Sequence, residues 1–255
     1  MRFGICTGLE NLKFLEKSGF DYLEWSLNLV AARSKIEFRE IVKKLEDSSI
    51  KCEAMNCFFP PNIKVVGPDI NESFIKDYIK KALDRSAQID TKVLVLGGGG
   101  QRSLPDGWDK KTGYDQFVAV LEFIGTEAAQ YGITIVLEPL NASETNLVKS
   151  IKEGLLMVKG LNNPNVKLLA DFYHMRRDNE CMEDIDTTKG WLKHIHIANS
   201  NGRVFPGEIK EDDYTGFFNA LKRIDYEERI SIEASTSSFE VDATKALILL
   251  KEICK

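Results

Sequence analysis

The chain has 255 residues, of which 43% are hydrophobic and 29% charged, the balance of a soluble globular protein large enough for one substantial core. Its net charge of −5 repels phosphate backbones and gives no support for binding to anionic membranes, so neither nucleic acid nor a membrane surface is an expected partner. No run of about 18 apolar residues is present, so we expect no membrane-spanning helix.

The cysteines follow neither a disulfide framework nor a metal-binding spacing. They are Cys6, Cys52, Cys57, Cys181 and Cys254. An odd number of thiols without such a framework is typical of a reducing compartment. The first residues also lack an apolar stretch long enough for a signal peptide. We therefore expect a cytoplasmic protein.

Eight short apolar segments, rich in β-branched residues, recur along the chain. Continuous apolar runs are typical of strands buried on both faces, as in parallel sheets. In chain order, the expected strands are 2–6, 21–25, 50–55, 92–97, 133–138, 166–171, 194–199 and 229–234. The helical segments expected between and after them are Leu9–Lys17, Ile36–Leu45, Phe74–Ala87, Tyr114–Tyr131, Ile151–Val158, Tyr214–Ile224 and Ala243–Ile253.

Strands and helices that alternate eight times form either a closed barrel or an open doubly wound sheet. The count of eight favours the barrel, and no GxGxxG turn follows the first strand, where a dinucleotide-binding sheet carries one. The run Gly97–Gly100 is interpreted as a flexible loop that permits close backbone approach. We predict an α/β protein with a single (β/α)₈ TIM-barrel domain over residues 1–255. The weakest patterns lie at 58–71 and 176–189.

Acidic residues and a histidine mark the carboxyl ends of the last four expected strands, where TIM barrels carry their active sites. In strand order these residues are Glu138, Asp171, His196 and Glu233. Acid groups that meet in a dry pocket need a compensating charge, and a divalent cation supplies it. Oxygen ligands with one imidazole suit Mn²⁺, Mg²⁺ or Co²⁺. Each acid alone also fits a structural role, as an acceptor for backbone N–H groups, but four consecutive strands favour a metal site.

His194 and His196 are two residues apart, so both side chains face the same side of their strand. His196 lies nearer the carboxyl end and is the expected ligand. His194 lies deeper, where a supporting or structural role is expected.

Further polar residues leave the same strands and are candidates for ligand binding. They are Asn141, Glu144, His174 and Arg203. The fixed donors of an arginine suit the clamping of hydroxyl groups. Trp108, in the loop after the fourth strand, is a candidate to cover the pocket and stack on a ligand. Each of these residues also fits the role of an ordinary loop side chain.

Four motifs stand out at the ends of the last four expected strands. They are LExxNxxE at Glu138–Glu144, DFYHM at Asp171–Met175, HIHIANSNGR at His194–Arg203 and IEAS at Ile232–Ser235. With these motifs the chain resembles the sugar isomerase/epimerase superfamily of xylose-isomerase-like barrels, and within it most closely the ketose 3-epimerases of the D-tagatose/D-psicose type. Two departures are visible. The arginine follows Asn201 and Gly202, where the epimerases tend to carry Asn-Arg. Pro139 follows Glu138, as in hydroxypyruvate-isomerase-like members.

The resemblance implies roles for the residues that match these motifs. The implied metal ligands are Glu138, Asp171, His196 and Glu233, and the implied substrate contacts are Glu144, His174 and Arg203. The two glutamates also form the implied acid/base pair. The implied cofactor is a divalent metal, with Mn²⁺ first and Mg²⁺ or Co²⁺ as alternatives. The family is often dimeric or tetrameric, so a homodimer or homotetramer is expected.

The function that we expect is epimerisation of a free ketose at C3 through a cis-enediolate. The same metal site also fits an aldose–ketose or hydroxypyruvate-type isomerase, or a related cyclitol dehydratase or lyase. Apurinic-site endonucleases share the barrel but need a histidine-rich zinc cluster, and this chain has three histidines. A glycosidase needs two carboxylates but has no need of a histidine and an aspartate around a metal.

Overall fold

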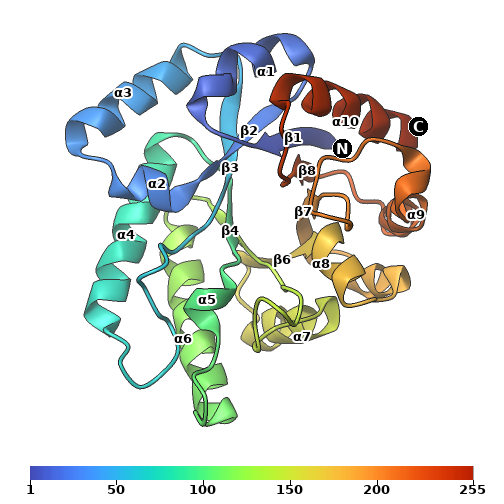
Figure 1. Cartoon of the computed structure of the whole chain (residues 1–255). Helices are drawn as coiled ribbons and strands as arrows, with labels where there is room; N and C mark the ends of the chain where they lie inside the picture. Colours follow the sequence, from blue (N-terminus) through green and yellow to red (C-terminus); the bar gives the residue numbers. More distant parts are fainter. Residues whose placement is uncertain (255) are drawn as a thin grey trace.

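The computed structural model describes residues 1–254, and its strands form a closed parallel barrel in sequence order (Figure 1). The strands are β1 (Arg2–Cys6), β2 (Tyr22–Ser26), β3 (Lys51–Asn56), β4 (Val93–Leu96), β5 (Thr134–Leu137), β6 (Val166–Asp171), β7 (Leu192–Ile197) and β8 (Arg229–Ile232). The barrel closes through parallel pairing of β1 with β8. The predicted TIM barrel is therefore confirmed, and the eight expected strands differ from the observed ones only at their ends.

Helices surround the barrel as an outer ring (Figure 1). The helices that match expected segments are α1 (Leu12–Ser18), α3 (Lys35–Glu46), α4 (Glu72–Gln88), α6 (Lys110–Ala129), α7 (Ile151–Leu161), α9 (Tyr214–Arg223) and α10 (Phe239–Ile253). Three short helices near strand ends were not expected: α2 (Leu27–Ala32), α5 (Gly99–Arg102) and α8 (Phe172–Arg177). Three 3₁₀ segments complete the described elements: η1 (Leu9–Asn11), η2 (Met182–Thr188) and η3 (Ile209–Glu211). Within residues 1–254, no helix is both long and apolar enough to cross a membrane.

Helix α3 illustrates how the sequence specifies an element of the outer ring. Ser34 and Glu37 form a reciprocal capping box at its start, which satisfies two backbone N–H groups that lack helical partners. Phe38, Ile41 and Leu45 are spaced three and four residues apart and are all buried. Each buried side chain of this size contributes roughly 1.5–3 kcal/mol to folding, so the inward face anchors the helix to the barrel.

The interior of the barrel changes from apolar to polar along its axis. Tyr22 lies in a cluster with apolar residues of β3, β4, β5 and β6. Two residues further along β2, on the same face, Glu24 is fully buried. His194 and His196 lie on β7 and are also fully buried. A polar layer therefore fills the interior next to the carboxyl ends of the strands.

Candidate active site and metal centre

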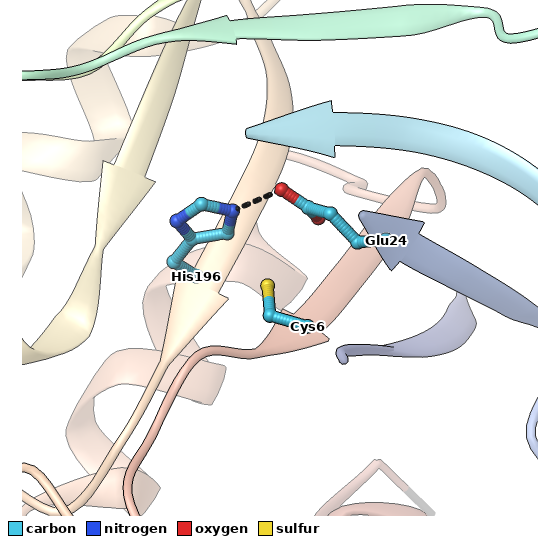
Figure 2. A group of neighbouring side chains, drawn as sticks. All are labelled: Cys6, Glu24 and His196. Atoms are coloured by element: carbon cyan, nitrogen blue, oxygen red, sulfur yellow. Dashed lines mark hydrogen bonds and ion pairs between the residues drawn. The ribbon is translucent and has the colours of Figure 1, made fainter. Parts of the chain in front are cut away.

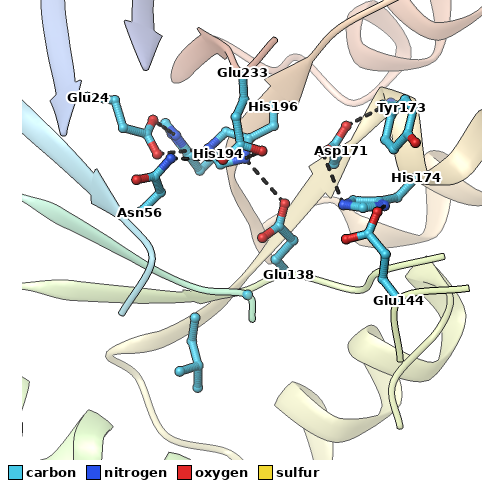
Figure 3. A network of polar contacts seen from close by, with 12 residues as sticks. Glu24, Asn56, Glu138, Glu144, Asp171, Tyr173, His174, His194, His196 and Glu233 are labelled. Atoms are coloured by element: carbon cyan, nitrogen blue, oxygen red, sulfur yellow. Dashed lines mark hydrogen bonds and ion pairs between the residues drawn. The ribbon is translucent and has the colours of Figure 1, made fainter. Parts of the chain in front are cut away.

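Four side chains from consecutive strands meet at the carboxyl end of the barrel (Figure 3). Glu138 follows β5, Asp171 ends β6, His196 lies on β7 and Glu233 follows β8. One ligand atom from each lies within 4.8 Å of those of the other three. Nδ1 of His196 is 3.2 Å from Oε1 of Glu138 and 3.4 Å from Oε2 of Glu233. The structure thus brings together the four residues predicted as metal ligands.

The two oxygens of Asp171 have different surroundings. Oδ1 accepts a hydrogen bond from the backbone N–H of Tyr173 at 2.7 Å, at the start of α8. Oδ2 is buried and has no hydrogen-bond partner in the described chain. Burial is the main cause that raises the pKa of Asp171, and the neighbouring Glu138 carboxylate raises it further. An unpartnered buried oxygen among carboxylates is costly, and a divalent cation satisfies it. The donor set therefore fits such an ion.

Glu233 is held in its ionised form by donors on both oxygens. Nδ2 of Asn56 donates to Oε1 at 2.8 Å, and Nη2 of Arg203 donates to Oε2 at 2.6 Å. Burial alone would raise the pKa of Glu233, but the charges of His196 and Arg203 outweigh it and lower the pKa to about 2. A glutamate in this state can act as a metal ligand or accept a proton.

A cavity of about 510 Å³ lies over the cluster. The residues that line it include Glu138, Glu233, Glu144, His174 and Arg203. A larger groove, about 700 Å³, lies on the outside of the barrel between α4 and α6 and contains none of the clustered residues. The chemistry therefore belongs to the smaller cavity.

His174 presents one ring nitrogen toward the cluster. The backbone N–H of Asn141 donates to Nδ1 at 3.3 Å, and its side-chain amide lies 2.7 Å from the same atom. A neutral His174 therefore carries its proton on Nε2. Nε2 is buried without a hydrogen-bond partner in residues 1–254, and lies 3.5 Å from Oδ2 of Asp171. This N–H is free to donate to an oxygen of a bound molecule.

Arg203 reaches the site from a strained turn. Its φ of +52° lies in the left-handed region, next to Gly202 with a φ of +94°. The guanidinium lies 4.8 Å from the centre of the Tyr173 ring, and Nη1 is 3.6 Å from Oε1 of Glu144. Arg203 thus reaches the cavity, although Gly202 separates it from Asn201 where the epimerases tend to carry Asn-Arg.

Trp108 does not join these residues. Its indole N–H donates to Oε1 of Gln116 on α6 at 3.3 Å, and it is not among the residues that line the cavity. The expectation that it covers the pocket is not supported by this geometry, because the side chain packs against α6 instead.

The Gly97–Gly100 segment allows the close approach expected from its composition. A Cβ at Gly97 would lie 2.1 Å from Oε2 of Glu138, and one at Gly99 would lie 2.0 Å from the backbone oxygen of Glu144. The segment is not simply a flexible loop, because α5 begins within it. The helix was missed because a single turn shows no apolar periodicity.

Arg102, at the end of α5, holds the backbone below the site. Its fully buried guanidinium donates to the backbone oxygens of Glu138 at 2.7 Å and Leu147 at 3.2 Å. It also donates to the backbone oxygen of Leu96 at 3.3 Å. Burial lowers the pKa of Arg102 to about 10, which keeps it charged at neutral pH. One cation therefore joins the ends of β4 and β5.

Sequence reasoning missed three residues of this site: Glu24, Asn56 and Arg102. Glu24 lies within an apolar strand and Asn56 ends β3, so both were visible as polar residues in or beside buried strands. A charged residue in a buried strand signals a paired group. Glu24 and Asn56 lie on β2 and β3, outside the last four strands, where the metal site was predicted.

Residues 12–253 match the family model of the xylose isomerase-like TIM barrel. The chain belongs to this family. An L-ribulose 3-epimerase from Methylomonas sp. (strain DH-1) is 35% identical over 122 residues, or 47% of this chain and 42% of that protein. The match thus spans less than half of that relative's length. A D-psicose 3-epimerase from Agrobacterium fabrum (strain C58 / ATCC 33970) is 27% identical over 226 residues, or 78% of this chain and 74% of that protein.

Solved structures of similar proteins agree in fold. The structure of D-psicose 3-epimerase with D-tagatose from Clostridium cellulolyticum H10 matches with a TM-score of 0.87 at 20% identity, and the match covers 100% of both chains. At this identity the likeness establishes the barrel, and the chemistry has to be argued from the site itself.

Proposed function

We propose that this protein is a divalent-metal-dependent isomerase that epimerises a free ketose at C3. The observation that carries the proposal is the convergence of Glu138 and Glu233 on one cluster with Asp171 and His196. The similarity to relatives named L-ribulose and D-psicose 3-epimerase supports this substrate class.

Glu138, Asp171, His196 and Glu233 would hold the cation, with Mn²⁺ as the first choice because three carboxylates and one imidazole suit it. When bound, the cation polarises the substrate carbonyl and offsets the negative charge of the enediolate. Nε2–H of His174 and the guanidinium of Arg203 would position substrate oxygens, and Glu144 would accept from a hydroxyl group.

The two glutamates supply the proton transfers. One carboxylate removes the proton from C3, which leaves a cis-enediolate, and the other, protonated, returns a proton to the opposite face of C3. Glu138 and Glu233 approach from β5 and β8, on either side of the intervening β6 and β7. Carboxylates on two sides of one carbon account for inversion there. Because the reaction is reversible, each glutamate serves as acid in one direction and base in the other.

An unphosphorylated substrate fits the charge of the cavity. Among the described residues that line it, Arg203 is the one permanent cation, and it is already paired with Glu233. A phosphate group would need further donors. The expected homodimer or homotetramer stays a prediction.

The decisive experiment is proton NMR of the purified protein with Mn²⁺ and a panel of free ketoses in D₂O, with the metal removed before the spectra are recorded. We expect deuterium at C3 together with the C3 epimer. The variants Glu138→Gln and Glu233→Gln should each lower turnover at least about 1000-fold, since each removes a proton-transfer group. The exposed Glu40→Gln on α3 serves as the control and should keep full activity.

Other labelling patterns would change the proposal. Deuterium at C1 or C2 would make the protein an aldose–ketose isomerase. Absence of exchange with every free ketose would contradict the assignment to this substrate class. Near-normal turnover in either glutamine variant would refute the acid/base pair.

A further inference from the structure

Glu24 lies behind His196, on the side away from the metal cluster. It is fully buried on β2, and its Oε1 is 2.8 Å from Nε2 of His196 (Figure 2). Its Oε2 is 2.7 Å from Nε2 of His194 (Figure 3). Both oxygens of one carboxylate are therefore used by two histidine rings of the same strand.

The direction of these hydrogen bonds follows from the chemistry of the carboxylate. Its two oxygens lie 2.7 and 2.8 Å from one imidazole nitrogen each, which is the geometry of a carboxylate that accepts from two N–H donors. An ionised carboxylate only accepts hydrogen bonds. Nε2 of His194 and Nε2 of His196 must therefore both carry protons. The nitrogen of His196 that remains is Nδ1, which is the atom that faces Glu138 and Glu233.

We propose that Glu24 is a positioning residue that fixes the ring of His196 with Nε2 protonated and Nδ1 directed at the metal. The proposal rests on the metal site put forward above. A carboxylate that holds the free N–H of a ligating histidine sets its orientation and raises its basicity as a ligand.

His194 has a defined part in this arrangement. Its ring lies 5.1 Å from that of His196, at an interplanar angle of 78°. Its Nδ1 is buried without a partner in the described chain, so its hydrogen bond goes to Glu24 alone. Without His194, Oε2 of Glu24 would be buried with no donor, and the carboxylate would be free to rotate away from His196. His194 thus keeps the Glu24 carboxylate in the position from which it orients His196.

A metal ion is an alternative partner for the same atoms of Glu24 and His196. Cys6 Sγ, together with Glu24 and His196, places three ligand atoms within 4.8 Å of one another (Figure 2). An ion there would make Glu24 a ligand instead of an acceptor. Both oxygens of Glu24 already lie 2.7–2.8 Å from histidine nitrogens, so its acceptor positions are used within the protein. The geometry therefore favours the hydrogen-bonded arrangement.

The test compares Glu24→Gln with a matched control, Glu53→Gln. Glu53 lies on β3 and pairs with Arg2 and Arg229 instead of with a histidine. Mn²⁺ affinity and stoichiometry are measured by calorimetry. The protonated ring nitrogens are read from ¹⁵N spectra with Mg²⁺, which is diamagnetic. The chain has three histidines, so single substitutions suffice to assign the signals.

We expect one Mn²⁺ per chain, a protonated Nε2 on His194 and His196, and roughly 10–100-fold weaker Mn²⁺ binding in Glu24→Gln. A glutamine can accept from one ring but its amide must donate to the other, so one histidine changes tautomer. Glu53→Gln should leave both readouts unchanged. If Glu24→Gln fails to fold, His194→Phe keeps a ring in place and should still weaken Mn²⁺ binding.

Three results would overturn the proposal. These are unchanged affinity and tautomers in Glu24→Gln, a proton on Nδ1 of metal-loaded His196, and a second Mn²⁺ that disappears in Cys6→Ser. If the wild-type protein binds no metal, the proposed function fails separately. The Nε2 proton of His194 then still shows whether Glu24 accepts from the histidine pair, and its absence would refute the arrangement.

Discussion

Asp171 shows, at the scale of one residue, that two interpretations of an acid at a strand end can both hold. One oxygen accepts a backbone hydrogen bond at the start of α8, as a structural role requires. The other is buried and lacks a partner, as a metal ligand would before binding. Sequence alone offered these as alternatives, because a motif specifies the residue and not the separate surroundings of its two oxygens.

Glu180 gives the protein a pH dependence that is independent of the cluster. It accepts a hydrogen bond from the backbone N–H of Ile151 at the start of α7. Burial raises its pKa to about 7, and the nearby Asp184 contributes. Its pKa in the unfolded chain is near 4.3. The folded state therefore binds the proton more tightly, and its stability falls as pH rises from about 4.5 to 7.

We predict that Glu180→Gln removes this loss of stability at higher pH. The amide oxygen of glutamine can still accept from Ile151, and no charge is buried. Urea unfolding at a series of pH values should show the variant more stable than wild type by about 1 kcal/mol at pH 8, after allowance for partial solvent exposure, with the difference vanishing near pH 4. The exposed Glu40→Gln controls for the loss of one charge. A difference that does not vary with pH would contradict the assignment.

At the scale of elements, the turn from β4 into α5 determines where Glu138 can lie. A Cβ at Gly97 would be 2.1 Å from Oε2 of Glu138, whereas one at Gly100 would meet nothing within 4 Å. We predict that Gly97→Ala displaces the carboxylate and lowers kcat/KM roughly 100-fold, since such displacements of about 1 Å have effects of this size. Gly100→Ala, in the same segment, should keep wild-type kinetics. Equal activity in the two variants would show that Glu138 adjusts freely.

The elements differ in how far they could be predicted. The eight strands could be predicted from the sequence because buried parallel strands are continuously apolar. Helices such as α3 could be predicted because apolar residues recur on one buried face over several turns. The short helices α2, α5 and α8 have too few turns for a periodic pattern, so they were missed. The convergence of Glu138 and Glu233 followed from barrel topology, since strand ends share one edge.

Loop geometry limited the prediction of the rest of the site. Arg203 reaches Glu233 because its backbone adopts a left-handed conformation, which the residue type does not announce. Trp108 is placed by its hydrogen bond to Gln116, a partner that sequence spacing alone does not select. Glu24, in contrast, could have been predicted, because a charged residue within an apolar strand indicates a buried polar partner.

For the whole molecule, the cluster should couple metal binding to stability. The proposed metal-free site holds close carboxylates, and a cation that binds only the folded state stabilises it by about 2.7 kcal/mol at 100 times its Kd. We predict that EDTA lowers the Tm of the Mn²⁺-loaded protein by about 5–10 °C, as calorimetry would measure. In Asp171→Asn, which can keep its cap to Tyr173, Mn²⁺ should have little effect on Tm. A Tm that does not respond to Mn²⁺ in the wild type would argue against the site.

The clustered residues lie on or directly after strands, while part of the cavity rim comes from loops. Phe59 and Pro61 follow β3, and Gln101 lies in the segment after β4. The hydrogen bonds between the barrel strands hold the clustered residues in place, whereas loops accept substitutions and changes of length more easily. Under the proposed function, changes of rim residues would alter which sugar enters the cavity, while the clustered residues would keep their positions. Substrate preference would then diverge faster among descendants of this chain than reaction type.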